Sequence, residues 1–291
     1  ILMNEDEIRQ KVSGYASVKK SRSGIEAIAE VDHDGGAVFH ILDHWSISDA
    51  VLTVKRQVRV KGNAEGGFSS SVIFETTSSV TWPDVQCFAP GALYGDPTFD
   101  GDRSPGGTLN NEARRFLMRE DILPAPLFAL SFKNGSSVAM LNPSPKGEST
   151  VEETRLTKAI MTDPRFRFGS LGAWQINESP VEFGFTYPGV TTAFGRGTDV
   201  PPATRWIKRF HPVAEETDHH YEIRFRFGAN EYFRDIVQDA WRWAWNTLDP
   251  QTSYTDVEQM RRLLIDQLAS QVTTIDGRTG IPFVMSTQDT A

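Results

Sequence analysis

Apolar and polar side chains alternate along much of the first 228 residues, which is the period of a half-buried β-strand. The segment 219–227 shows this alternation most clearly. Its apolar positions are Tyr221, Ile223, Phe225 and Phe227, and its polar positions are His220, Glu222, Arg224 and Arg226. A strand with one apolar and one polar face is typical of an antiparallel sheet that packs on one side and meets solvent on the other.

Two further segments predict neighbouring strands. In 52–60 the apolar residues again alternate, but Arg56 interrupts the apolar face and predicts a bulge or the end of the sheet there. Between 127–132 and 137–141 lies Asn134-Gly135, which predicts a hairpin with a tight type I′ turn. Because the strands follow one another without helices between them, residues 1–228 are expected to form a large antiparallel β-sandwich, and the fold class is mainly β.

The pattern changes to a helical one after residue 228. Apolar side chains recur every three to four residues over 233–248, which predicts one helix. A second helix is predicted from Thr255, which forms a capping box with Glu258, to about residue 274. Two helices joined by a short loop form an αα-hairpin. We therefore place a domain boundary at 228/229 and assign residues 229–291 to this hairpin.

The first predicted helix carries three tryptophans within five positions, Trp241, Trp243 and Trp245. Trp241 and Trp245 share a face, whereas Trp243 points about 160° away from Trp241. One interpretation is that all three are packing residues. The other is that one of them, with Trp243 as the candidate, lines a pocket and binds a substrate by stacking.

A sandwich that leads into a Trp-rich helical hairpin resembles the opening of the six-hairpin glycosidase superfamily, with residues 219–283 as the most specific part. The resemblance implies an N-terminal sandwich followed by an (α/α)6 toroid, in a carbohydrate-active enzyme. Residues 229–291 would then begin a toroid whose remainder is a missing C-terminal helical domain or another chain. Alternatively, they pack back on the sandwich. The resemblance is architectural, and no diagnostic catalytic motif accompanies it.

The loop 81–107 combines aromatic and acidic side chains and has neither a helical nor a strand period. A loop of this length in a compact domain is usually functional or disordered, and its aromatics argue against disorder. The candidates for stacking on a sugar are Trp82, Tyr94 and Phe99, and those for bonding hydroxyls or a uronate are Asp84, Asp96, Asp100, Asp102 and Arg103. The alternative is an ordered crossover whose acids cap turns.

Three functions remain open. A glycoside hydrolase needs two carboxyl groups about 5–9.5 Å apart, and the candidates are Asp84, Asp96, Asp100 and Asp102. A polysaccharide lyase of the same architecture needs a base and groups that neutralise a uronate, which Tyr94, Arg103 and Asn110 could supply. The third is a non-catalytic sugar-binding or assembly module that docks on another chain through Trp243 and the apolar stripe of 257–268.

Composition and charge exclude several classes of partner and cofactor. The 291 residues carry a net charge of −8, which argues against a nucleic-acid partner, and no apolar run is long enough for a membrane span. The single cysteine, Cys87, excludes an internal disulfide, and burial is its expected role. The spacing of Asp96, Asp100 and Asp102 does not match the EF-hand pattern, so neither a metal nor another cofactor is expected. The first residues lack the features of a signal peptide, which slightly favours the cytosol.

Overall fold

The computed structural model describes most of the chain. The described residues are 2–4, 7–9, 14–33, 35–77, 79–97, 113–145, 155–156, 161–162, 168–176, 179–189, 191–192, 206–207, 209–215, 217–229, 232–275 and 277–281. The chain divides into two compact units, Ile1–Leu248 and Asp249–Ala291.

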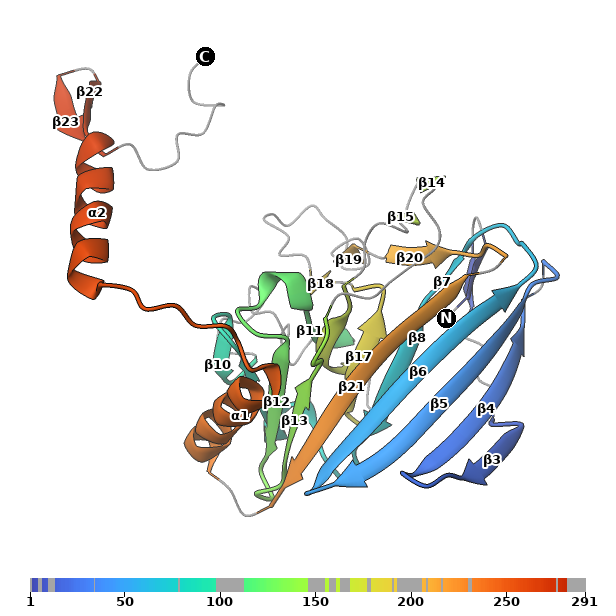
Figure 1. Cartoon of the computed structure of the whole chain (residues 1–291). Helices are drawn as coiled ribbons and strands as arrows, with labels where there is room; N and C mark the ends of the chain where they lie inside the picture. The colour runs from blue at the N-terminus through green and yellow to red at the C-terminus, as the bar shows by residue number, and fades with distance from the viewer. Residues whose placement is uncertain are drawn as a thin grey trace. The chain divides into compact units, whose positions relative to one another are not determined.

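The first unit is built on a nine-stranded antiparallel sheet, called the large sheet here (Figure 1). Its strand order is β10-β9-β12-β13-β21-β6-β5-β4-β3. In chain order these strands are β3 (Ser17–Lys20), β4 (Ile25–Asp32), β5 (Val38–Ser48), β6 (Val51–Lys61), β9 (Val85–Ala89), β10 (Leu93–Gly95), β12 (Leu127–Phe132), β13 (Ser137–Leu141) and β21 (Asp218–Gly228). The mainly β, antiparallel class expected from the alternating pattern is confirmed.

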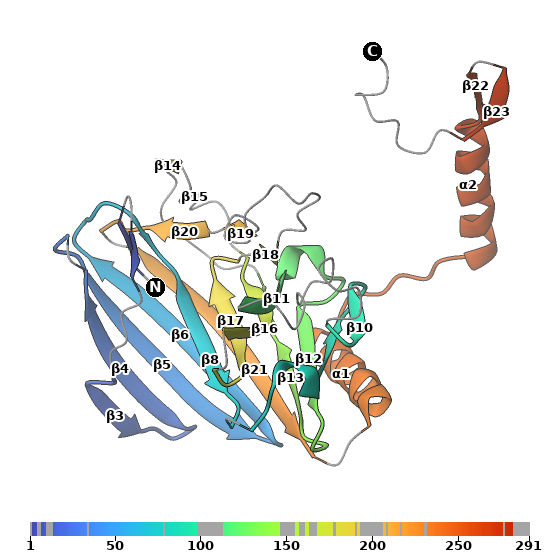
Figure 2. The ribbon, with the colours of Figure 1, turned by 180° about the vertical axis from the view of Figure 1, so that it is seen from behind.

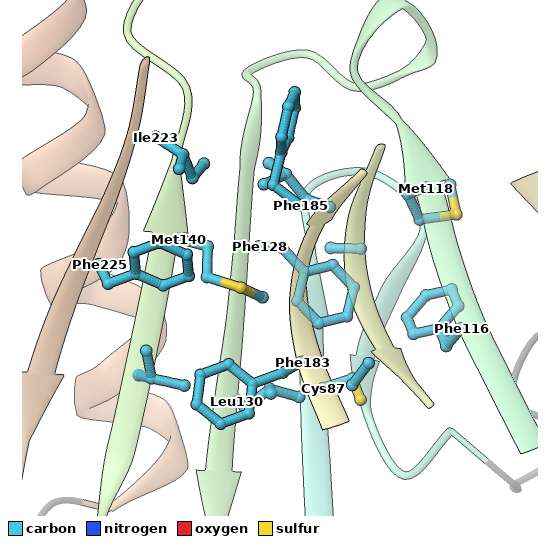
Figure 3. Close-up of a cluster of buried hydrophobic side chains, with 14 of the residues drawn as sticks. Cys87, Phe116, Met118, Phe128, Leu130, Met140, Phe183, Phe185, Ile223 and Phe225 are labelled. Carbon is cyan, nitrogen blue, oxygen red and sulfur yellow. The ribbon is translucent and has the colours of Figure 1, made fainter. Parts of the chain in front are cut away.

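A four-stranded antiparallel sheet, the small sheet, covers one face of the large sheet (Figure 2). Its order is β11 (Ala113–Arg119), β16 (Ser170–Ile176), β17 (Glu182–Tyr187) and β8 (Ser70–Glu75). The two sheets bury one continuous apolar core between them, in which Met140 and Phe225 of the large sheet meet Phe183 and Phe185 of the small sheet (Figure 3). Cys87 belongs to this core, and burial raises the pKa of its thiol.

Shorter elements complete the first unit. A six-stranded sheet consists of β14 (Arg155–Leu156), β15 (Met161–Thr162), β20 (Arg209–Pro212), β7 (Gly67–Phe68), β1 (Leu2–Asn4) and β2 (Glu7–Arg9). β18 (Thr191–Thr192) pairs with β19 (Trp206–Ile207), and the 3-10 helices are η1 (Trp82–Asp84) and η3 (Glu120–Ile122).

Helix α1 (Phe233–Leu248) packs on the other face of the large sheet, over β12 and β13 (Figure 1). Ile236, Ala240 and Ala244 recur every four residues, and this stripe lies against Ala129 and Ala139. The predicted end of this helix, before Asp249-Pro250, is correct, whereas it begins at Phe233 and not directly after the predicted N-cap Asn230. Because its apolar face is buried by the sheet, α1 belongs to the first compact unit, which ends at Leu248.

The second unit contains α2 (Val257–Ser270) and the pair β22 (Thr273–Ile275) and β23 (Arg278–Gly280). Asp256, not Thr255, caps the helix, because its Oδ1 accepts the N–H groups of Glu258 and Gln259 at 2.9 and 3.0 Å. The helix ends four residues earlier than predicted, and Thr273 and Thr274 pair as a strand instead. The start of an (α/α)6 toroid is not confirmed. Neither of the two helices described has the length and apolar character that a membrane crossing requires.

The prediction of a bulge or sheet end at Arg56 is wrong. β6 pairs without interruption through Arg56, with Asp43 on one side and Tyr221 on the other. The Arg56 guanidinium donates Nε and Nη2 to the two oxygens of the buried Asp43 carboxylate at 2.7 and 2.6 Å. Burial would lower the pKa of Arg56, but Tyr221 and Asp43 hold it above its usual value. The cation on the apolar face is therefore paired inside the sandwich.

The predicted hairpin of β12 and β13 is correct, but its turn is not of type I′. A type I′ turn needs a positive φ at both central residues, and only Gly135 of the Asn134-Gly135 pair has one, at 83°. Gly135 N–H donates to the carbonyl of Phe132, and the Asn134 side chain accepts the Ser136 N–H at 3.0 Å. The longer loop lets Asn134 remain at negative φ.

Candidate functional site

A groove of about 580 Å³ lies on the outer face of the large sheet, with α1 as one wall. We call it the α1 groove. Strands β5, β6 and β21 form its floor. Its lining residues are Ser46, Ser48, Asp49, Val51, Thr53, Arg224, Arg226, Asp239, Arg242, Trp243 and Asn246.

The strand and helix periods place these side chains. On the floor, Thr53 of β6 pairs in register with Arg224 of β21, and every second residue of each strand points outward. On the wall, burial of Ile236, Ala240 and Ala244 fixes the rotation of α1. That rotation directs Asp239, Trp243 and Asn246, which are four and three residues apart, to the flank above β21. The groove therefore follows from docking α1 on the sheet.

One charged pair among the described residues connects the floor to the wall, and others lie within the wall and within the floor. Arg226 Nη2 lies 3.2 Å from Asp239 Oδ2, and Arg242 Nη1 lies 3.9 Å from Asp239 Oδ1. Farther along the floor, Arg224 Nε donates to Glu222 Oε1 at 2.6 Å. The side chains of these pairs remain partly exposed. The groove thus presents positioned guanidinium groups and carboxylates to solvent.

A second hollow of about 510 Å³ continues along the same face of β5, β6 and β21. Its outward side chains include His44, Lys55, Gln57, His220 and Glu222. Lys55 Nζ lies 3.4 Å from Glu222 Oε2, and Glu222 also accepts from Arg224 of the α1 groove. Polar side chains therefore extend without a break along the centre of the sheet.

Asp218 closes the far end of this polar row. Its carboxylate accepts from Gln57 Nε2 at 2.8 Å and from Arg59 Nε at 3.1 Å. Partial burial would raise the pKa of Asp218, but the hydrogen bonds from Gln57 and Arg59 hold it below its usual value. Asp218 is thus an ionised, hydrogen-bonded group at neutral pH.

The prediction that 81–107 is one loop without regular structure is wrong, because η1, β9 and β10 lie within its described part. Two of the residues predicted there have structural roles. Trp82 is fully buried in the core between the sheets, so it offers no surface on which a sugar could stack. Asp84 Oδ2 accepts the backbone N–H and the hydroxyl of Thr81 at 3.1 and 2.7 Å, and these bonds lower the pKa of Asp84. Asp84 therefore caps η1, which is the alternative that the sequence left open for the acids of this loop.

The remaining predicted residues fall into three groups. Tyr94 and Asp96 are exposed, and the Tyr94 ring packs 5.1 Å from the ring of Phe88, which also meets Trp241. Trp243 lines the α1 groove. The others lie outside the described residues, and they are Phe99, Asp100, Asp102, Arg103 and Asn110. Their proposed roles stay predictions.

Sequence reasoning did not identify the groove residues Thr53, Arg224, Arg226 and Asp239. The available signal was the polar face of 219–227, where Arg224 and Arg226 follow Glu222 at alternate positions. That face predicts solvent exposure, but it does not predict that a helix from the next segment lies beside it. Within the described part of the chain, no group of three or more His, Cys, Asp or Glu side chains is arranged to hold a metal ion.

Comparisons with known proteins show similarity of structure alone. No family model and no curated protein sequence matches the chain. Solved structures to which it is similar include the α-N-acetylgalactosaminidase NagBb from Bifidobacterium bifidum, at 11% identity and a TM-score of 0.39 over 84% of this chain and 33% of that one. Another is the GalM/aldose epimerase homologue from C. elegans, at 9% identity and a TM-score of 0.39 over 74% and 69% of the two chains.

A third is the Slr1438 protein from Synechocystis sp. PCC 6803, at 9% identity and a TM-score of 0.37. That alignment covers 75% of this chain and 65% of that one, so the chain spans less than two thirds of the Slr1438 protein and about a third of NagBb. At these TM-scores the likeness bears on neither activity nor ligand.

Proposed function

We propose that the chain binds a carbohydrate in the α1 groove and is the sugar-binding part of a carbohydrate-active protein. The observation that carries this proposal is the placement of Trp243 on the wall of a groove whose floor is lined with hydroxyl and guanidinium groups. A sugar ring has apolar C–H faces that pack on an aromatic ring, and hydroxyls that both donate and accept hydrogen bonds. The groove offers partners for both surfaces.

The polar groups of the groove are suited to hydroxyl recognition. Ser46, Ser48 and Thr53 both donate and accept, whereas Arg224 and Arg226 only donate. Asp239 and Asn246 add acceptors on the wall. A set that mixes donors and acceptors on rigid strands and a docked helix can satisfy several hydroxyls of one ring at once. This is the reason for preferring a saccharide to an apolar ligand.

Glycoside hydrolysis by paired carboxylates is the finer proposal. The acid and its partner would come from Asp84, Asp96, Asp100 and Asp102, of which Asp84 also caps η1. The alternatives are a lyase that uses Tyr94, Arg103 and Asn110, and a sugar-binding or assembly module without catalysis. Release of reducing ends that Asp→Asn variants at 84, 96, 100 or 102 abolish would support hydrolysis. Unsaturated products would support the lyase, and binding without turnover would support the module.

A glycan array probed with the 291-residue chain tests the carbohydrate proposal. The array should carry neutral and uronate-containing oligosaccharides of several lengths. We expect retention on a related group of saccharides, with competition by the same saccharides in solution. Absence of retention on every glycan, by protein with an intact unfolding transition, would contradict the proposal.

A further inference from the structure

The α1 groove is locally cationic, although the whole chain carries a charge of −8. Its lining contributes three guanidinium groups, from Arg224, Arg226 and Arg242, and two carboxylates, from Asp49 and Asp239. Arg224 is also paired with Glu222, which lies beyond the groove on the same strand. The groove is therefore richer in cations than the chain as a whole.

Within the groove, one carboxylate serves two guanidinium groups. Asp239 lies between Arg226 and Arg242, at 3.2 and 3.9 Å. Each guanidinium has five N–H donors, so a single carboxylate leaves most of them available. Asp239 is 45% exposed, and ion pairs this open to solvent are screened and exchange readily. An anionic ligand can therefore compete with Asp239 for the same donors.

Resting on the proposed carbohydrate function, we propose that the α1 groove selects acidic saccharides, which carry a uronate carboxylate, through Arg224, Arg226 and Arg242. The planar guanidinium fork matches a carboxylate with two parallel hydrogen bonds. Trp243, on the same wall as Arg242, packs on the ring that bears the carboxylate. Asp239 sets the affinity, since it occupies part of the site when no ligand is bound.

The test compares oligogalacturonate with its methyl ester, because the two share a backbone and differ only in the charge of the carboxyl group. Calorimetric titration of the full chain is expected to give about tenfold tighter binding of the acid form. This preference should shrink as salt is added, because the pairs are exposed. Equal affinity for both forms would overturn the inference and leave the carbohydrate proposal standing.

The Asp239→Asn variant provides a second, opposite prediction. Removal of the competing charge frees Arg226 and Arg242, so the ratio of the affinity for oligogalacturonate to the affinity for its methyl ester should rise several-fold. Arg226→Met should weaken binding of the acid form. The matched control is Arg22→Gln, which removes a cation from the exposed turn between β3 and β4. We expect it to leave the affinity for both forms unchanged.

The outcomes separate the two proposals. An unchanged ratio of the two affinities in Asp239→Asn would overturn the inference. Binding of neutral glycans with no binding of either galacturonate form would also overturn it, while the carbohydrate proposal would stand. Failure to bind any saccharide would overturn both. Urea unfolding of each variant establishes that the fold is intact.

Discussion

Glu120 is a buried carboxyl group, and among the described residues no cation forms an ion pair with it. It lies in η3 with 4% of its surface exposed, and its Oε2 accepts the Gly169 N–H at 2.7 Å. Burial raises the pKa of Glu120 from its ordinary value of 4.5 to about 8. The group is therefore protonated in the folded protein at neutral pH.

This shift makes stability depend on pH. Between pH 4.5 and about 8 the folded protein keeps a proton that the unfolded chain has released. The free energy of unfolding should therefore fall as pH rises through this range, by up to about 1.4 kcal/mol per pH unit from this group, and level off above it. The Glu120→Gln side chain cannot ionise but can still accept the Gly169 N–H. This variant should therefore lack the part of the pH dependence of the free energy of unfolding that comes from Glu120.

Urea unfolding of both proteins from about pH 5 to about pH 8 measures the effect. As pH rises, the free energy of unfolding of Glu120→Gln should increase steadily relative to that of the wild type. Glu65→Gln, at an exposed position, is the control. Parallel curves for the wild type and Glu120→Gln would show that Glu120 does not titrate as described.

At the residue scale, the sequence predicts which face a side chain occupies better than it predicts its partner. The alternation over 219–227 correctly separates the buried Tyr221 and Phe225 from the polar side chains. The role of Arg56 does not follow from the local pattern, because its partner, Asp43, lies on another strand and the register that pairs them depends on the whole sheet. Trp82 illustrates the same limit, since a tryptophan in a loop is equally suited to a sugar or to a core.

Helix α1 is the element that creates the site. Its alanines Ala240 and Ala244 meet Ala129 and Ala139 on the strands, and these small side chains allow the helix to lie close to the sheet. The tryptophans then extend to either side of the contact. Trp241 meets Phe88, and Trp243 lines the α1 groove.

Ala244→Leu should disturb this contact. Ala244 is fully buried, so the added methyl groups have no space, and overpacking of this kind costs about 1–3 kcal/mol. We expect a lower free energy of unfolding in urea together with weaker saccharide binding, because the wall of the groove moves. Gln238→Leu, at an exposed position of the same helix, is the control. Unchanged stability and binding in Ala244→Leu would contradict the packing described for α1.

At the element scale, the helical period predicted α1 and its end correctly because its apolar stripe is long. The second helix was less well predicted, since Thr255 and Asp256 are both acceptable caps and only geometry selects Asp256. The apolar period and the capping residues of a helix do not indicate the surface on which the helix packs. Packing against β12 and β13 depends on small residues of strands about 100 positions earlier in the chain.

For the whole molecule, the division into compact units predicts which fragments fold. Without α1, the outer face of the large sheet would expose an apolar surface formed by Phe88, Leu127, Ala129, Ala139 and Leu141. A fragment of residues 1–248 should therefore unfold cooperatively in urea. A fragment of residues 1–228 should be markedly less stable and bind a hydrophobic dye. Equal stability of the two fragments would support the boundary expected at 228/229.

The architectural resemblance accounts for the sandwich but not for the position of the helices. A Trp-rich stretch after a sandwich fits both a toroid and a helix packed back on the sheet. In the structure α1 packs back on the sheet, because the small side chains of the helix fit the outer face of the sheet. The candidate site could not be predicted for the same reason, since it is formed where segments near residues 50, 225 and 243 meet.

Calorimetric titration of the best-retained saccharide into three proteins tests the central claim most directly. The proteins are the wild type, Trp243→Leu and Trp245→Leu, because both tryptophans lie on α1 but only Trp243 lines the α1 groove. Loss of an aromatic stacking surface should weaken binding by Trp243→Leu about tenfold, with Trp245→Leu unchanged. Equal affinity of Trp243→Leu and the wild type would contradict carbohydrate binding in the α1 groove.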